Sequence, residues 1–419
     1  MCGIVGYSGP KEPLPILING LSRLEYRGYD SAGIAISDGN KITIEKKEGK
    51  LDVLKDHLKN NQMSGNVGIG HTRWATHGIP NDVNAHPHSD NNEEFAIIHN
   101  GIIENYAEIK KDLLKEGFEF KSDTDTEVVA VELSRKWSGE LLKTVVDVAN
   151  SLEGTYALLV TTTKEEGTIV AGRLMSPLVL GVGDDEVFLA SDSAAILEHT
   201  KKMIFLENGD FVEIKNGKYK LFDSDLNEIE REIQEIDWEV SEAEKSGYDH
   251  FMYKEILEQS EVIERTISGR LDTNSDDIPI MSDHASKFEK IWIVACGTAY
   301  HAGLFGKDLF EKVLGVPVSV ELASEFRYRE PIVGKNDLGI VISQSGETMD
   351  TIAATELLKE NGSHVLALVN VVGSSLARMA DSVFYLHVGP EIGVASTKAY
   401  LGMLVSQFCL LYTSDAADE

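Results

Sequence analysis

Residues 291–315, IWIVACGTAYHAGLFGKDLFEKVLG, begin with a short apolar run and continue into a long stretch with helical spacing. The same order recurs at 338–362, where LGIVIS leads into QSGETMDTIAATELLKENG, and again at 364–380 and 383–405. Apolar runs that alternate with helical patterns are typical of βαβ units. The second half of the chain is therefore predicted to form an α/β domain with a parallel sheet.

Three loops of this predicted sheet carry hydroxyl side chains at the carboxyl ends of strands, where such sheets bind ligands. They are C296-G-T-A299, S343-Q-S-G-E-T348 and E391-I-G-V-A-S-T-K398. Hydroxyl groups and backbone N–H groups at a helix start attract phosphate. For Ser345 or Thr348 taken alone, helix capping is the alternative. Because the three loops face one edge, phosphate binding is favoured, and the missing lysine-containing pattern G-x-x-x-x-G-K-[ST] argues against nucleotide hydrolysis.

The first half, to about residue 225, contains shorter β-rich segments separated by turns. Asp38, Gly39 and Asn40 lie between two alternating runs and predict a hairpin. Further strands are expected at 94–103, 155–163, 168–174, 187–191 and 203–214, and helices at 15–23, 106–116 and 126–136. This pattern predicts an α+β layered domain with antiparallel sheets.

The segment 226–285 has an acidic, helix-favouring composition and is predicted to be a helical linker, although a charge run can also be a solvated helix face. It separates a first domain at 2–225 from the parallel-sheet domain at 286–412. The last residues, 413–419, are polar and atypical of a domain end.

Composition limits the classes of function. A chain of 419 residues is too long for one ordinary core. With 39 Lys and Arg against 69 Asp and Glu, the net charge is −30, so we expect no nucleic-acid or anionic-membrane partner. The three cysteines are far apart and lack C-x-x-C spacing, which fits a reducing cytosol. No apolar run of membrane-spanning length is present, and a cytoplasmic location is expected.

Cys2 follows the initiator methionine and precedes Gly3, Ile4 and Val5. One interpretation is packing, because a small apolar residue suits the edge of a buried first strand. The other is catalytic: removal of Met1 would leave Cys2 with a free α-amine of pKa about 7.7–8.0, which can take the thiol proton. The residue alone leaves both interpretations open.

Arg73, Asp125 and the pair Asn100 and Gly101 bear groups suited to an amino-acid substrate. The planar guanidinium of Arg73 can hold a carboxylate, and Asp125 can hold an ammonium group. The Asn100 amide and the Gly101 N–H, after an apolar strand, are two donors suited to an oxyanion. The alternatives are helix capping for Asp125 and a type I′ hairpin turn for Asn-Gly. Together with Cys2 these groups describe an acyl-transfer site.

A metal site is not favoured. Histidines 71, 77, 86 and 88 are spaced by six, nine and two residues, which matches no common zinc pattern, and no cysteine lies near them in the sequence.

The motifs MCGIVGY, RLEYRGYDSAG, HTRWATHG, NAHPH, HNGIIEN and SDTDTE, followed by ASEFRYR, SQSGET and EIGVASTKA, closely resemble the family of isomerising glutamine:fructose-6-phosphate aminotransferases. The resemblance extends to about residue 405. It implies an N-terminal-nucleophile hydrolase sandwich, the glutaminase domain, at 2–225 and a first sugar-isomerase (SIS) domain at 286–412. It also implies that glutamine and fructose 6-phosphate give glutamate and glucosamine 6-phosphate, the first step of hexosamine synthesis, with no metal or other cofactor.

The resemblance assigns roles to individual residues. Cys2 would be the nucleophile, and Asn100 and Gly101 would stabilise the oxyanion. The glutamine site would comprise Arg73, Trp74, Thr76, His77 and Asp125, with Arg27 and Asp30 in a supporting motif. The sugar phosphate would be held by Thr298, Ser343, Gln344, Ser345, Thr348 and Ser396.

Two departures qualify this assignment. Ala299 stands where the family often has serine, so one sugar contact is expected to be lost or replaced. The chain is also expected to be truncated after the first sugar-isomerase domain, leaving glutaminase activity but an incomplete isomerase half. A homodimer is implied for the full-length chain. The alternative function is a sugar-phosphate sensor that binds without turnover.

Overall fold

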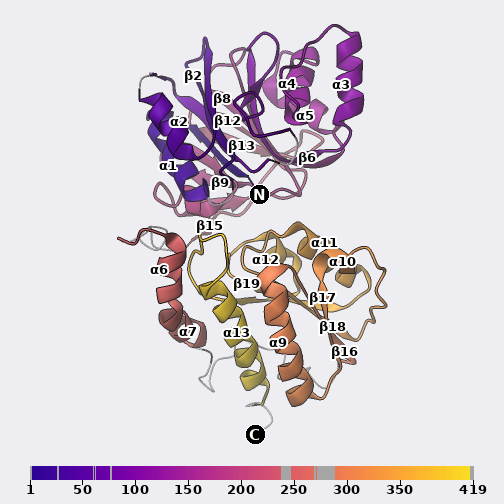
Figure 1. Ribbon diagram of the computed structural model, residues 1–419. Helices are drawn as coiled ribbons and strands as arrows, with labels where there is room; N and C mark the ends of the chain where they lie inside the picture. The colour runs from indigo at the N-terminus through magenta and orange to yellow at the C-terminus, as the bar shows by residue number, and fades with distance from the viewer. Residues whose placement is uncertain are drawn as a thin grey trace. The chain divides into compact units, whose positions relative to one another are not determined.

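The computed structural model describes residues 2–25, 28–59, 61, 63–75, 78–236, 247–268, 270 and 288–415, with side chains up to Leu411. The chain divides into two compact units, Met1–Asp237 and Trp238–Glu419. Figure 1 shows that the first unit is dominated by β-strands and the second by helices around a sheet.

The first unit contains two sheets of antiparallel strands over the residues described. The eight-stranded sheet has the spatial order β15 (Gln234–Glu235), β11 (Lys202–Phe205), β9 (Val179–Val182), β10 (Val187–Ala190), β1 (Gly3–Ser8), β4 (Val67–Arg73), β2 (Ser31–Ser37) and β3 (Ile42–Glu48). The seven-stranded sheet has the order β14 (Glu228–Ile229), β13 (Lys218–Phe222), β12 (Phe211–Lys215), β8 (Thr168–Leu174), β7 (Gly154–Thr162), β6 (Phe95–Ile103) and β5 (His88–Ser89).

Helices cover the outer face of each sheet. The elements are α1 (Pro13–Leu24), α2 (Leu51–Leu58), α3 (Tyr106–Lys115), α4 (Thr126–Arg135), α5 (Leu141–Ala149) and the 3₁₀ turn η2 (Ser193–Ala195). α1 packs on β1 and β4, whereas α4 and α5 pack on the seven-stranded sheet. The inner faces of the two sheets share one apolar core that joins Ile4 and Ile69 to Ile98 and Leu159. The unit is therefore a four-layer α-β-β-α sandwich, which confirms the layered α+β prediction.

The local sequence explains α1 and the hairpin. Pro13 stands at the start of α1, where its missing N–H costs no hydrogen bond, and the buried Leu17, Leu21 and Leu24 follow at helical spacing. The predicted hairpin is confirmed, since β2 pairs with β3 and the Asp38 carboxylate accepts the N–H groups of Asn40 and Lys41.

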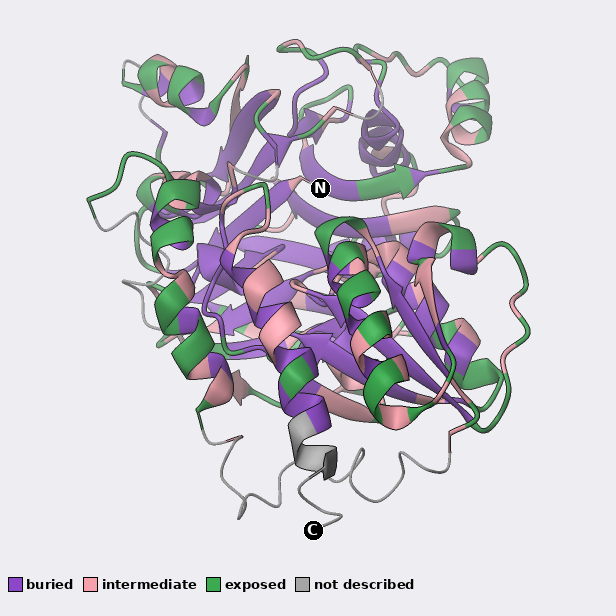
Figure 2. Cartoon of the chain, turned by 60° about the horizontal axis from the view of Figure 1, so that its bottom comes forward, coloured by how far each residue is buried: buried purple, intermediate pink, exposed green. Residues whose placement is uncertain are grey.

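The second unit contains a parallel sheet, as predicted. Its order is β17 (Val318–Leu322), β16 (Lys290–Ala295), β18 (Asp337–Ser343), β19 (His364–Val369) and β20 (Ser382–Tyr385). The helices are α6 (Phe251–Leu257), α7 (Gln259–Ile267), α9 (Gly297–Leu314), α10 (Ala323–Phe326), α11 (Met349–Glu360), α12 (Ser375–Met379) and α13 (Lys398–Asp415). Figure 2 shows its central strands β16, β18 and β19 buried almost throughout, with exposed residues on the outer sides of the helices.

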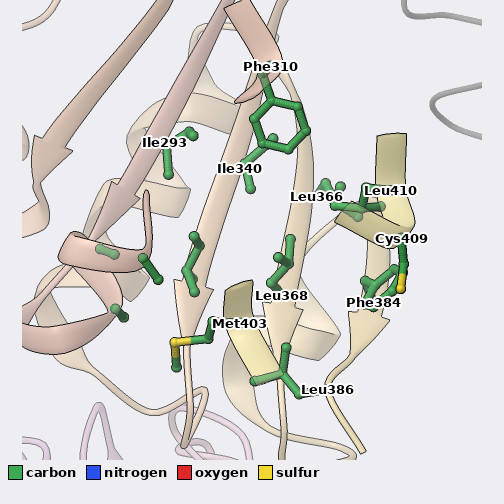
Figure 3. Close-up of a cluster of buried hydrophobic side chains, with 14 of the residues drawn as sticks. Ile293, Phe310, Ile340, Leu366, Leu368, Phe384, Leu386, Met403, Cys409 and Leu410 are labelled. Atoms are coloured by element: carbon green, nitrogen blue, oxygen red, sulfur yellow. The ribbon is translucent and has the colours of Figure 1, made fainter. Parts of the chain in front are cut away.

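Alternate residues of each strand pack on opposite faces of this sheet. Ile293 and Ile340 join the core under α9 and α13, where Phe310, Met403 and Leu410 also lie (Figure 3). The neighbouring strand residues, such as Val294 and Val341, belong to a separate core with α10, α11 and α12. Burial on both faces accounts for the nearly continuous apolar runs of these strands.

The predicted helical linker differs from the structure at its start. Residues 226–236 form no helix: β14 pairs with β13 and β15 pairs with β11, both in the first unit. Ile229 faces Leu221 in this ladder, so cross-strand packing prevails over the helix preference of the acidic residues. Helices α6 and α7 follow within the second unit. Residues 237–246, 269 and 271–287 lie outside the described part.

Within the described residues, no helix combines the length and the apolar character needed to cross a membrane.

Replacing Leu159 by alanine should destabilise the first unit. Leu159 is fully buried between the two sheets, and truncation of such a leucine leaves a cavity that costs about 2–5 kcal/mol of unfolding free energy. Leu114→Ala on the exposed side of α3 is the matched control and should change stability by less than about 0.5 kcal/mol. Chemical denaturation measures both, and equal effects would contradict the placement of the core.

Candidate functional site

Cys2 lies directly before β1, a central strand with β10 on one side and β4 on the other. Its sulfur accepts a hydrogen bond from the Trp74 N–H at 3.2 Å and lies 3.6 Å from the Trp74 carbonyl oxygen. Burial raises the pKa of the Cys2 thiol, while this N–H and the charge of Arg73 act in the opposite direction. The thiol is therefore held mainly protonated and needs a base to become a nucleophile.

The stretch after β4 is held in place by Asp30. The Asp30 carboxylate accepts the Ala75 N–H at 2.8 Å, and the Asp30 N–H donates to the Arg73 carbonyl oxygen at 3.0 Å. The Arg73 side chain is buried and donates from Nη2 to the Gly78 carbonyl oxygen at 3.1 Å. A cation buried beside the thiol is placed to bind an anionic group. The sequence indicated Asp30 only as part of a supporting motif.

Trp74 is 42% exposed, and its ring meets the edge of Tyr29 at 5.3 Å between centroids. Three other residues predicted for this site, Arg27, Thr76 and His77, lie outside the described residues.

Asn100 and Gly101 lie inside β6 and not in a hairpin turn, so the turn alternative is wrong. Gly101 pairs with Tyr156 of β7 and has φ +132°, a conformation that side chains rarely adopt. A Cβ there would also collide with the Thr155 carbonyl oxygen. The Asn100 Nδ2 donates to the Cys2 carbonyl oxygen at 2.9 Å. The strand thus brings an amide donor to the residue that bears the thiol.

Asp125 occupies the N-cap position of α4, but its side chain makes no capping hydrogen bond. Its Oδ2 accepts the Ile103 N–H at the end of β6, at 2.8 Å. The carboxylate is buried, and its charge acts on Arg73 and His99. Asp125 therefore fixes the end of the strand that carries Asn100 and places a negative charge near the buried cation.

A cluster of buried histidines lies behind Asn100. His71 stacks on His86 at 4.2 Å between ring centroids, and His86 meets the edge of His88 at 4.7 Å. Burial lowers the pKa of His71 to about 3, and it also lowers the pKa values of His86, His88 and His99. Across the described part of the chain, no three His, Cys, Asp or Glu side chains converge to hold a metal ion.

The second unit contains a cavity of about 190 Å³ at the carboxyl ends of its strands. β16 and β18 are adjacent and parallel, so the loops that follow them open at the same edge. The cavity is lined by Cys296, Thr298, Ala299, Ile342, Ser343, Gln344, Ser345, Thr348, Ser396 and Met403. All six residues predicted for a sugar-phosphate site are in this set, and none of the lining residues carries a full charge.

The 343–348 loop is folded by its own hydroxyl groups. Ser343 Oγ accepts the Gly346 N–H at 3.1 Å and lies 3.1 Å from Thr348 Oγ1. Thr348 occupies the N-cap position of α11 without a side-chain capping bond, so capping alone does not explain it. Gly346 has φ +66°, and a Cβ there would collide with the Ser374 side chain. This close approach requires glycine at the turn.

Glu391, to which the sequence gave no role, organises the loop before α13. It accepts hydrogen bonds from Ser396 Oγ at 2.9 Å and from the backbone N–H of Thr397 at 2.7 Å. The Ser396 proton is thus used by the carboxylate, which leaves the oxygen of Ser396 as an acceptor. Lys398 is buried and paired with Glu258 at 2.6 Å, so its charge is already compensated.

Comparison with known proteins follows the same division. The glutamine amidotransferase domain family matches residues 56–245, and the SIS domain family matches 285–411. An isomerizing glutamine–fructose-6-phosphate aminotransferase of Clostridium acetobutylicum is 49% identical over 414 residues, which are 98% of this chain and 68% of the relative. The corresponding protein of Clostridium tetani is 50% identical with the same coverage. The chain belongs to the glutamine–fructose-6-phosphate aminotransferase family.

Membership of the aminotransferase family confirms the resemblance carried by the sequence motifs. The stacked antiparallel sheets give the first unit the N-terminal-nucleophile hydrolase fold, and the second unit has the SIS fold. A solved C-terminal domain of a glucosamine-fructose-6-phosphate aminotransferase from Francisella tularensis is 38% identical, with a TM-score of 0.38 over 42% of this chain and 51% of that chain.

Because of the buried histidines, we expect the free energy of unfolding to decrease as the pH is lowered below about 6.5. A histidine whose pKa is lowered by folding binds a proton in the unfolded chain first, so its stabilising contribution is complete above about pH 6.5 and is lost as the pH falls toward the folded pKa. Each such histidine removes roughly 1 kcal/mol per pH unit in that range. Urea unfolding of the protein at pH 7.5, 6.5 and 5.5 should show a steepening loss.

The matched variant for this measurement is His88→Gln, which removes one of these titrating groups. Its stability should depend less steeply on pH than that of the unmodified chain, whatever its absolute value. Equal slopes would show that the cluster does not titrate as described.

Proposed function

We propose that this chain is a glutamine-dependent amidotransferase that acts on fructose 6-phosphate and glutamine to give glucosamine 6-phosphate and glutamate. The observation that carries the proposal is the contact of Cys2 with both Trp74 N–H and the Asn100 amide, beside the buried Arg73. Family membership supports the same reaction. We assign glutamine hydrolysis to residues 2–225 and sugar-phosphate binding to residues 286–412.

The reaction begins at the Cys2 sulfur. After removal of Met1, the free α-amine of Cys2 takes the thiol proton, and the sulfur attacks the side-chain amide carbon of glutamine. The carbonyl oxygen becomes an oxyanion, which Asn100 Nδ2 and the Gly101 N–H stabilise. The C–N bond then breaks, the amine proton passes to the leaving nitrogen as ammonia departs, and a thioester remains. Water hydrolyses the thioester to glutamate and restores the thiol.

Arg73 and Asp125 are proposed to hold the two charged groups of glutamine. Arg73 binds the α-carboxylate and Asp125 binds the α-ammonium group, and the opposite signs of these buried side chains support this orientation. The Asp125 Oδ2 already accepts a backbone N–H, so Oδ1 serves the substrate. Trp74, Thr76 and His77 complete the proposed pocket, and Arg27 supports it.

The cavity of the second unit is proposed to bind fructose 6-phosphate. Ser343, Ser345, Thr348 and Thr298 supply hydroxyl donors to the phosphate, together with Gln344 and the backbone N–H groups at the start of α11. Ser396 has a different part, because Glu391 uses its proton. We assign it as an acceptor for a sugar hydroxyl. Ala299 lines the same cavity and supplies no hydroxyl.

A sugar-phosphate sensor without turnover is not favoured, because binding alone does not require a thiol aligned with an amide donor and a buried cation. Dimerisation of the full-length chain and a cytoplasmic location remain parts of the proposal. The three cysteines, all free thiols, support a reducing compartment.

Cys2→Ala should abolish ammonia release from glutamine while leaving fructose 6-phosphate binding unchanged. The sulfur is the only nucleophile in the proposed reaction, and the sugar cavity belongs to the other compact unit. A coupled glutamate assay and calorimetric titration with fructose 6-phosphate measure the two properties. Residual ammonia release at the rate of the unmodified chain would exclude Cys2 as the nucleophile, and loss of both properties would contradict the division between units.

Glu391→Ala should weaken fructose 6-phosphate binding by about tenfold or more, because three groups of the cavity loop lose their common acceptor. Glu391→Gln keeps one acceptor oxygen for the two backbone N–H groups and should weaken binding less. Glu356→Ala, an exposed acid on α11, is the control and should bind as the unmodified chain does. Identical affinities for all four proteins would remove Glu391 from the site.

A further inference from the structure

The Asn100 side-chain amide has one orientation that its neighbours allow. Its Nδ2 lies 2.9 Å from the Cys2 carbonyl oxygen, which can only accept a hydrogen bond. On its other side, Oδ1 lies 3.0 Å from Nε2 of His71. The amide therefore donates toward Cys2 and accepts from His71.

The contacts of His71 fix its tautomer. Nε2 faces two acceptors, the Asn100 Oδ1 and the His99 carbonyl oxygen at 3.1 Å, so this nitrogen must carry the hydrogen. The ring is neutral at ordinary pH, since burial lowers its pKa to about 3. Nδ1 then carries no hydrogen, and among the described residues this buried atom has no hydrogen-bond partner. His71 is thus a neutral donor aimed at the amide oxygen.

A second layer holds the His71 ring in its plane. His86 stacks on it with an angle of 28° between the rings. The Thr155 carbonyl oxygen accepts from His99 Nε2 at 3.3 Å, so the neutral His99 ring accepts at Nδ1 from the Thr126 hydroxyl at 2.9 Å. The Thr126 oxygen in turn accepts from His86 Nε2 at 3.0 Å. Each hydrogen in this hydrogen-bond network therefore has one consistent position. The His86 ring, which stacks on His71, cannot turn without breaking its hydrogen bond to Thr126.

We propose that His71 is a positioning residue for glutamine hydrolysis, whose Nε2–H holds the Asn100 amide so that Nδ2 faces the glutamine carbonyl oxygen that becomes the oxyanion. The inference rests on the proposed function of Asn100 as an oxyanion donor. A flipped amide would turn its oxygen toward the developing negative charge and repel it. The ground state, by contrast, gains little from the orientation. His71 therefore acts on the rate of the chemical step and hardly on glutamine binding.

The test compares two substitutions of similar length. His71→Gln can place an N–H donor near the position of Nε2, whereas His71→Met fills the space without a donor. His199→Met, at a half-buried histidine stacked on Phe188, is the control for the chemical change itself. Steady-state ammonia release gives kcat and KM for each protein, and thermal unfolding verifies that each is folded.

For His71→Met we expect kcat to fall by about tenfold to a hundredfold, below the roughly 10²–10³-fold loss that follows removal of an oxyanion donor itself. KM for glutamine should stay within about threefold, and His71→Gln should recover most of the lost rate. In the unmodified protein, ¹⁵N NMR of labelled histidine should show His71 with its hydrogen on Nε2, assigned by the signal that His71→Gln removes.

Equal kcat values for His71→Met and the unmodified chain would overturn the inference, as would an Nδ1–H tautomer of His71 or a glutamine variant no faster than the methionine variant. These failures differ from failure of the proposed function. If the unmodified chain, with Met1 removed, releases no ammonia, the glutaminase assignment itself falls, and the positioning role falls with it.

Discussion

The hydrogen bond from the Asn100 amide to the Cys2 carbonyl oxygen connects the two sheets of the first unit at the point where the thiol lies. Cys2 precedes a central strand of one sheet, and Asn100 lies on β6 of the other. The distance between thiol and amide is therefore set by the packing of the sandwich core and not by a flexible loop. Site geometry held by packed strands is more precise than geometry held by loops. The packing of the core between the two sheets therefore determines the geometry of the proposed reaction site.

The described environment of the thiol supports the proposal that the nucleophile and its base belong to one residue. Burial raises the pKa of Cys2, and the histidines nearest to the oxyanion strand are neutral and engaged with threonine, asparagine and carbonyl groups. None of these imidazoles has a hydrogen bond to the sulfur. The Trp74 N–H stabilises the thiolate once it forms, but it cannot remove a proton. Among the groups that the described residues place near the sulfur, a free α-amine on Cys2 is the simplest base, and its pKa suits neutral pH.

The sequence predicted much of the fold because the signals were local and consistent. Continuous apolar runs such as 291–295 gave the parallel sheet, and Asp38 with Gly39 gave the hairpin. The strand predicted at 94–103 is confirmed as β6 and includes Asn100 and Gly101, so only the turn alternative for this pair was wrong. Local signals failed where long-range pairing prevailed, since residues 228–235 join two sheets instead of forming a helix. The motifs predicted the residues of the candidate sites, but they did not predict the residues that hold these in position. Glu391 and His71 act through partners that only the fold brings close, so spacing gave no sign of them.

The proposed sugar-phosphate cavity and the proposed oxyanion donors face the same electrostatic problem in an acidic chain. With a net charge of −30, a cluster of lysines around each anion would attract the protein's own carboxylates. Lys398 shows this outcome, since Glu258 takes up its charge inside the core. The cavity proposed for the sugar phosphate is lined by several hydroxyls and an amide, and the proposed oxyanion donor is an amide oriented by a neutral imidazole. A neutral donor held in a fixed direction stabilises an anion without adding a positive charge with which the surrounding carboxylates could pair. Such a donor also lets a product anion leave. Orientation, and therefore the hydrogen-bonded layer behind each donor, takes the place of charge in the sugar-phosphate cavity and at the proposed oxyanion donors, whereas the charged Arg73 is proposed to bind the glutamine carboxylate.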